Sequence, residues 1–446
     1  MNRHWTLGTD LALDFITALK WSDLPPDVRH QSKRCLLDLM GALIAGRRTP
    51  VADIMAGIAC DQFPGAHATI VVSGEHVSAV GAALANGFAQ NALDIDDGYR
   101  RIKGHPGAAF LPALLAALEV TGECRGSEFL TALVIGYEIG IRAGLIRHAL
   151  FSTYHSSGSW GAVAAAAAAG RLMGLPRGQL RDALGTAEYH APIAPMMKAI
   201  EVPSMGKDSL GWGNLTGLAS VFMARRGFTG IEPLFSESPE KHWLTGLGRQ
   251  YEILNLYFKP YAACRWAQPA VAGCLALVKE NRLRPEDIAL VKVRTFAAAA
   301  ALTRQAPSNT EEAQYNLAFP VAAALVDGAV GPEQVLPPRL FARDILDLAD
   351  LLEVEIAPEF EALFPTKALA AIEITTHDGK RYESGPIEAP WEPPDTLPGD
   401  GELEEKFTRL VKPVLGQSRA NQLLQLVWRL ESDHDARQLI QLAVAG

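Results

Sequence analysis

The chain has 446 residues, of which 48% are hydrophobic and 20% charged, and its formal net charge is -9 at pH 7. This length suits two or three domains with a sizeable core, and the acidic balance argues against nucleic acid or an acidic membrane surface as a partner. The five cysteines are scattered and form no C-x-x-C pair, so we expect buried thiols in a reducing compartment. Neither a signal-peptide pattern nor an uncharged apolar run of spanning length is present. The sequence therefore predicts a cytoplasmic protein without a membrane span.

Helical periodicity dominates the first half of the chain. Apolar residues at three- and four-residue steps predict a core-facing helix from Pro25 to Ala45, which Pro26 is able to open. Further helices are expected at Val77–Leu93, Ala108–Leu118, Ser127–Leu145, Ser159–Met173 and Asp208–Arg225. The first and fourth of these are rich in alanine and apolar on nearly every side, which is typical of helices buried inside a bundle.

Strand-like stretches appear after Cys264. They begin at Ala289, Leu352 and Ala368, and Asp378-Gly379 in the last of them is a strong hairpin signal. A proline-rich stretch from 385 to 401 excludes helix and favours an extended linker, after which helical periodicity returns. We therefore predict a mainly α fold with a large all-helical bundle domain, discontinuous in sequence over 1–265 and 400–446, and a smaller α+β domain over 266–399.

The segment "NALDIDDGYRRIKGHPG" gathers charge between two apolar helices. Asp94 follows an apolar helix, where a carboxylate opposes the helix dipole and requires a function or a cationic partner. Asp97 would share a face with Asp94 if the helix continued, and His105 before Pro106 must have an extended backbone, so it is a loop histidine suited to acid or base chemistry. The alternative interpretation is a solvated loop whose aspartates form surface ion pairs with Arg100, Arg101 and Lys103.

Two other segments combine glycine with an ionisable side chain. His155 in "STYHSSGSWGAVAAAA" lies just before an N-capping serine and a buried helix, and by itself it is better explained as a structural loop histidine. Lys207 in "VPSMGKDSLGWGNLTG" lies beside Gly206 near the start of a helix. An ammonium near the positive end of a helix is disfavoured, which would suit a base acting on a carbon acid.

Several segments together resemble the MmgE/PrpD family. They are "NGFAQNALDIDD", "HPGAAFLPALLAALE", "FLTALVIGYEIGIR", "HSSGSWGAVAAAAAAGRLMGL", "GLASVFMARRGFTG", "YAACRWAQPAVAG" and "AQYNLAFPVAAAL". The resemblance extends from about the first helix to "EEKF" and keeps the order of the motifs. It implies a cofactor-independent enzyme, usually a homodimer, that acts on a small polycarboxylate at a site between a helical and an α+β domain.

The resemblance transfers functional residues only in part. Asp94, His105, His155 and Lys207 match positions of the family's active site. Four other positions depart from the family pattern: Asn91 replaces a histidine, Gly98 a threonine, Gln268 a histidine and Phe319 a tyrosine. The loss of these groups argues against the dehydratase and decarboxylase activities of the family, because both need placed proton donors.

The remaining residues favour proton transfer at a carbon next to a carboxylate. We expect an isomerase of the iminodisuccinate epimerase type, with Lys207 and either Tyr99 or His105 on opposite faces of the carbon. Substrate carboxylates would be held by residues of the same segments, for which the candidates are Arg265, Gln268, Lys103, Arg101 and Asp97. No metal or other cofactor is expected.

Alternatives to the epimerase remain open. Three of them belong to the family: a 2-methylcitrate dehydratase-like lyase, a cis-aconitate decarboxylase-like lyase and a non-catalytic carboxylate-binding member. The residues Asp94-Ile95-Asp96-Asp97 also match the D-x-D-D acid motif of helical terpene cyclases, although aromatic residues make up only 7% of the chain. Such an acidic cluster could instead bind a divalent metal.

Overall fold

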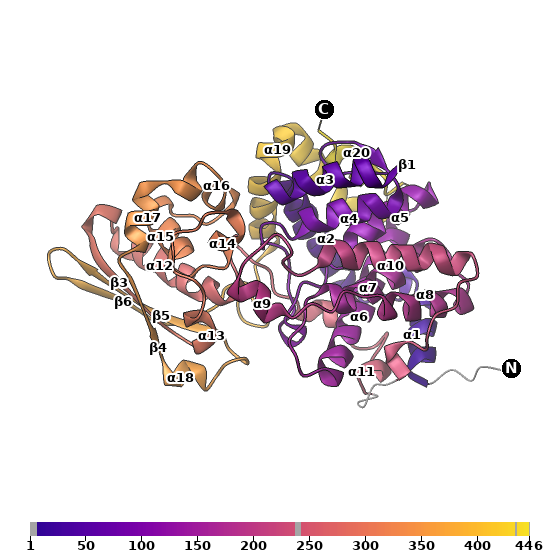
Figure 1. Cartoon of the computed structure of the whole chain (residues 1–446), viewed down its shortest axis with the longest axis horizontal. Helices are drawn as coiled ribbons and strands as arrows, with labels where there is room; N and C mark the ends of the chain where they lie inside the picture. The colour runs from indigo at the N-terminus through magenta and orange to yellow at the C-terminus, as the bar shows by residue number, and fades with distance from the viewer. Residues whose placement is uncertain (1–6, 237–241, 433–434, 446) are drawn as a thin grey trace.

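The computed structural model describes residues 7–236, 242–432 and 435–445. Helices account for 59% of the residues and strands for 11%, so the predicted fold class, mainly α with a smaller α+β part, is confirmed. Figure 1 places the smaller part, which carries the larger sheet, beside a larger helical part that contains both the first and the last helices.

The larger part is a helical bundle with one short hairpin. Its strands β1 and β2 are Pro64–Thr69 and His76–Val77. Its helices are α1 (Leu7–Ala18), α2 (Pro26–Gly46), α3 (Pro50–Gln62), α4 (Ala79–Gln90), α5 (Leu111–Thr121), α6 (Gly126–Leu150), α7 (Gly158–Leu172), α8 (Arg177–Tyr189), α9 (Met196–Glu201), α10 (Leu210–Arg225), α11 (His242–Thr245), α19 (Asp400–Arg429) and α20 (Gln438–Ala443).

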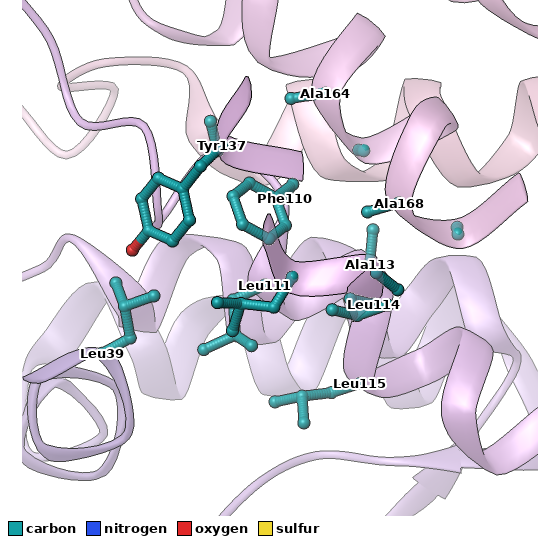
Figure 2. Close-up of a cluster of buried hydrophobic side chains, with 14 of the residues drawn as sticks. Leu39, Phe110, Leu111, Ala113, Leu114, Leu115, Tyr137, Ala164 and Ala168 are labelled. Atoms are coloured by element: carbon teal, nitrogen blue, oxygen red, sulfur yellow. The ribbon is translucent and has the colours of Figure 1, made fainter. Parts of the chain in front are cut away.

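Small residues allow the central helices to pack closely. Helix α7, the Ala-rich segment, packs against both α6 and α10. A Cβ atom at Gly217 of α10 would lie 2.4 Å from the carbonyl oxygen of Ala162, and one at Gly140 of α6 would lie 2.7 Å from Cβ of Ala164. Figure 2 shows the adjoining core, where Phe110 meets Tyr137 edge to face, with their ring centroids 5.1 Å apart. A larger residue at either glycine would cost about 1–3 kcal/mol through overpacking.

The last long helix, α19, returns from the smaller part and packs along α2. Its Lys406 is 1% exposed and donates from Nζ to a carboxylate oxygen of Asp38 in α2, 2.5 Å away. The same ammonium donates to the carbonyl oxygen of Ile95, at 2.6 Å. Helix α19 is therefore tied both to the bundle and to the loop that follows α4.

The smaller part has a four-stranded sheet in the order β4-β3-β5-β6. Strand β3 (Ile288–Thr295) pairs in parallel with β4 (Leu352–Ile356) and antiparallel with β5 (Leu369–Thr376), which forms a hairpin with β6 (Arg381–Glu388) around Asp378-Gly379. Helix α12 (Gln268–Asn281) packs on β5 and β6. The other helices are α13 (Ala297–Ala300), α14 (Thr310–Gln314), α15 (Ala318–Asp327), α16 (Pro332–Val335), α17 (Arg343–Ala349) and α18 (Pro358–Glu361).

The packing of α6 explains its apolar sequence. By length and composition it could cross a membrane, but its most apolar stretch is entirely buried inside the protein. This burial is typical of a core helix in a soluble protein.

The end of α4 differs from the sequence prediction. Helix α4 ends at Gln90 rather than Leu93, and Asp94 adopts a left-handed backbone with φ of +52°. The aspartates therefore lie on a loop and not along one face of a continuing helix.

Candidate active site

A cavity of about 310 Å³ lies where the two parts of the molecule meet. Its lining comes from the loop after α4, from α9, from the segment 257–266 before α12, and from the loops around 315, 364 and 392. It combines aromatic and sulfur-containing side chains with charged ones, as small-molecule sites commonly do. The cavity therefore brings together residues far apart in the sequence.

One side of the cavity carries an aspartate cluster, formed by Asp94, Asp96 and His105. Nδ1 of His105 lies 3.0 Å from a carboxylate oxygen of Asp96, and Nε2 lies 3.5 Å from one of Asp94. Burial alone would lower the pKa of His105, but the attraction of Asp96, and of Asp208 at 3.9 Å, raises it above its ordinary value. The surrounding carboxylates therefore favour the protonated form of His105, whose ring faces the cavity.

Two buried lysines neutralise this cluster. Nζ of Lys259 donates to a carboxylate oxygen of Asp94 at 3.0 Å, and Nζ of Lys207 lies 3.7 Å from the other oxygen. Although burial opposes ionisation of Asp94, the two lysines and His105 lower its pKa to about 2. Lys207 also donates to the carbonyl oxygen of Asn91 at 2.6 Å and to the side chain of Gln314 at 2.8 Å.

Two further aspartates, Asp97 behind the cavity surface and Asp208 on it, support the aspartate cluster. Asp97 accepts hydrogen bonds from the amide of Gly107, at 3.0 Å, and from the hydroxyl of Tyr137. Burial raises the pKa of Asp97 to about 7. Asp208 accepts a hydrogen bond from the hydroxyl of Ser157 at 2.8 Å, beside the start of α7. These bonds fix the loop that carries His105.

The other side of the cavity carries an arginine cluster, formed by Arg100, Arg265 and Glu392. Both guanidinium groups contact the carboxylate of Glu392, whose side chain is only 6% exposed. Cζ of Arg265 also lies 4.3 Å from the centre of the Tyr257 ring, in cation–π geometry. Burial lowers the pKa of Arg265 to about 10, so it remains charged at neutral pH.

Tyrosines fill the space between the two clusters. Tyr154, Tyr257 and Tyr315 line the cavity, and burial raises the pKa of each. Tyr154 donates to the carbonyl oxygen of Lys103 at 2.7 Å. In the described ranges the Tyr315 hydroxyl has no hydrogen-bond partner, so it is available to a ligand.

The structure places four of the predicted residues on the cavity surface: Asp94, His105, Lys103 and Arg265. Lys207 contacts Asp94 directly behind this surface. Positive φ angles of non-glycine residues occur at Asp94 (+52°), Lys103 (+49°) and Lys207 (+36°). Such strained backbones are concentrated at functional sites.

The other predicted residues do not line the cavity. The hydroxyl of Tyr99 donates to Glu252, and Arg101 is exposed. His155 stacks on His148 with 4.3 Å between ring centroids. Gln268, expected to bind substrate, donates instead to two backbone carbonyls, 2.8 and 2.9 Å away.

Burial also contradicts the interpretation of the aspartates as part of a solvated loop. Asp94, Asp96 and Asp97 are at most 2% exposed, and the cationic partners of the first two are His105 and the buried lysines. A metal is not needed to balance these carboxylates, and the described part of the chain contains no group of three or more His, Cys, Asp or Glu residues placed to hold one.

The four departures from the family pattern lie outside the cavity lining. Asn91 donates to Asp96 at 2.8 Å, and Phe319 is a core residue. A Cβ atom at Gly98 would lie 2.2 Å from Cζ of Tyr257. Glycine at this position thus allows Tyr257 to enter the cavity.

Sequence reasoning missed Lys259, Asp96, Asp208, and the contribution of Glu392. Lys259 precedes Pro260 just as His105 precedes Pro106, so the extended backbone before proline was a usable signal. Glu392 lies in the proline-rich linker, 292 residues from its partner Arg100. No local pattern connects these two residues.

Comparison with known proteins identifies related chains. Residues 10–247 match the MmgE/PrpD N-terminal domain, and residues 261–432 match the MmgE/PrpD C-terminal domain. Cis-aconitate decarboxylase-like protein oryM of Aspergillus oryzae is 27% identical, with 96% of this chain and 95% of the relative covered. The cis-aconitate decarboxylases of Aspergillus terreus (24%; 98% and 94% covered) and Homo sapiens (26%; 96% and 92% covered) are also similar.

These relatives correct the expected activity. Decarboxylases are lyases, whereas the sequence interpretation favoured an isomerase of the epimerase type; that expectation is wrong. The four substituted positions on which that expectation rested do not line the cavity.

Proposed function

Because the chain belongs to the MmgE/PrpD family, we propose that it is a lyase that removes CO₂ from a small unsaturated polycarboxylate of the cis-aconitate type. The observation that carries this proposal is the placement of His105 between Asp94 and Asp96, on the surface of a cavity that also contains two arginines.

The reaction requires carboxylate binding and one proton. Arg265, Arg100 and Lys103 hold the carboxylates that the product retains. When the bond to the departing carboxylate breaks, its electron pair stays on the substrate and is delocalised over the neighbouring double bond. A proton must then be added to carbon, and CO₂ leaves.

His105 is the proton donor in this proposal. The nearby carboxylates raise its pKa and so favour retention of the proton, and Asp94 does not compete for that proton, since its own pKa is about 2. The hydroxyl of Tyr315 donates a hydrogen bond to the charge that develops during bond breaking.

The residues behind the cavity surface have positioning roles. Lys207 holds Asn91 and Asp94 in place. Asp97 fixes Gly107, and His155 accepts or donates a hydrogen bond at the Ser159 hydroxyl, 2.7 Å away, at the start of α7. Tyr99, Arg101 and Gln268 order the loops around them.

The proposed assembly is a homodimer in the cytoplasm. Its support is a group of exposed apolar side chains in two segments, 150–151 and 189–212: Leu150, Phe151, Tyr189, Ile193, Met197, Val202, Met205 and Trp212. Large exposed apolar areas commonly mark protein interfaces.

The test uses cis-aconitate in deuterated water, with CO₂ release and the deuterium content of the product followed by mass spectrometry and NMR. One deuterium per CO₂ is expected, and His105→Asn should slow the reaction at least about 100-fold. The matched control is His67→Asn, since His67 is exposed on β1. Binding of cis-aconitate without CO₂ release would overturn the proposal in favour of a non-catalytic protein, and water loss from 2-methylcitrate would replace it with a dehydratase.

A further inference from the structure

The arginine cluster contains a carboxylate of the protein itself. Glu392 is the shared partner of Arg100 and Arg265, and all three residues line the cavity. Arg100 also donates to the carbonyl oxygen of Thr366. A buried carboxylate is an unexpected component of a site that must bind anions, because it repels them and competes for the same guanidinium groups.

The charges on the cavity lining outside the aspartate cluster, Asp208 and the buried lysines can be counted. Arg100, Arg265 and Lys103 contribute three positive charges, and Glu392 contributes one negative charge. Lys103 has no ion-pair partner in the part of the chain that the structure describes. Glu388, 3.9 Å from Arg100, is itself paired with Lys367 at 3.3 Å. The net charge of plus two corresponds to two substrate carboxylates.

The opposite side of the cavity offers little to a third carboxylate. Asp94 and Asp208 both face it, and its cations Lys259 and His105 are already paired with aspartates. A carboxylate held there is less well stabilised than one on the arginines. An interaction accelerates a reaction only if it is stronger in the transition state than in the ground state. A carboxylate that is poorly stabilised in the ground state therefore loses CO₂ more readily.

We propose that Glu392 is a specificity-determining residue: its carboxylate occupies one anion position between Arg100 and Arg265, so this side of the cavity binds two substrate carboxylates and leaves a third toward Asp94 and Asp208. The inference rests on the proposed function only in naming a tricarboxylate as the substrate. Glu392 thereby selects which carboxylate is retained and which is exposed to loss.

The experiment measures binding without turnover. Isothermal titration calorimetry compares propane-1,2,3-tricarboxylate with pentanedioate, two saturated acids, for the unchanged protein and Glu392→Gln. The variant frees a third positive charge, so its affinity for the tricarboxylate should rise about tenfold while that for the dicarboxylate changes less than about threefold. An equal change for both ligands, or no change for either, would overturn the inference.

Matched variants separate charge from structure. Glu392→Asp keeps the charge and should keep the original ratio of affinities, and so should Glu388→Gln, which removes a neighbouring carboxylate outside the cavity lining. If Glu392→Gln does not fold, as judged by circular dichroism, Arg100→Gln supplies the test: it should weaken dicarboxylate binding about tenfold, and unchanged binding would refute the charge count. A shifted ratio without CO₂ release from cis-aconitate would reject only the proposed function.

Discussion

Replacing Lys406 by Met removes one partner of a fully buried ion pair. The Lys406 side chain is 1% exposed and that of Asp38 is 0% exposed, so the variant leaves a carboxylate without its cation in the interior. Burial already raises the pKa of Asp38, and Lys406 is the main group that opposes this rise. The carbonyl oxygen of Ile95 loses a donor as well.

The expected cost is about 4 kcal/mol, because breaking a buried ion pair typically costs about 3–5 kcal/mol. At about 2.1 cal/mol/K per residue, cooperative unfolding of the whole chain would have an entropy near 0.9 kcal/mol/K. Dividing the loss of unfolding free energy by this entropy gives a fall of about 4 °C in the midpoint temperature. The assay is urea denaturation and thermal melting, both followed by circular dichroism. CO₂ release should also decline in the folded fraction, because Ile95 lies between Asp94 and Asp96.

A double-mutant cycle provides the control. Replacing both partners, in Asp38→Leu/Lys406→Met, substitutes apolar side chains for the pair and should cost much less than Lys406→Met alone. If the single change costs below about 1 kcal/mol, or if the double change costs the sum of the two single changes, the reasoning is refuted.

Three further predictions concern the cavity and its support. Because His105 has a raised pKa and acts as the acid, the rate of CO₂ release should be constant below that pKa and fall as pH rises through it; a rate that increases with pH would contradict its role. Asp97 retains a proton in the folded protein up to about pH 7 that the unfolded chain releases near its ordinary 3.8, so stability should fall between these pH values. Asp97→Asn should reduce that fall, and equal urea-denaturation profiles for both proteins would show that Asp97 is ionised throughout. Gly98→Thr places Cβ on the Tyr257 ring and should destabilise the protein by about 1–3 kcal/mol in urea denaturation, whereas a stability equal to that of the parent would show that the ring moves freely.

The fold was largely predictable because its elements carry local signals. Helix α7 has an uninterrupted run of small residues, and β5 and β6 are joined by Asp378-Gly379, which supplies the glycine with positive φ that the turn needs. Helix ends were less predictable. Helix α4 ends at Gln90, and the loop after it is held by Lys259, which donates to the carbonyl and the carboxylate of Asp94 from a distant segment.

The candidate site was predictable only in part. His105 and Lys207 lie in segments with recognisable glycine and proline patterns, so their sequence context singled them out. The pairing of Arg100 with Glu392 depends on how the proline-rich linker crosses the cavity. Gln268 shows the converse error, since a residue within a family motif was expected to bind substrate but donates instead to backbone carbonyls.

The bond between Asp38 and Lys406 also has a consequence during synthesis. The two residues are 368 positions apart, and at about 5–20 residues per second the ribosome needs roughly 20–70 seconds to make the second after the first. Throughout that interval the nascent bundle lacks α19, and the loop bearing the aspartates lacks the donor to Ile95. The last lining residue of the cavity, Glu392, is made only 14 residues before Lys406, so the helical core and the cavity are completed at nearly the same late moment.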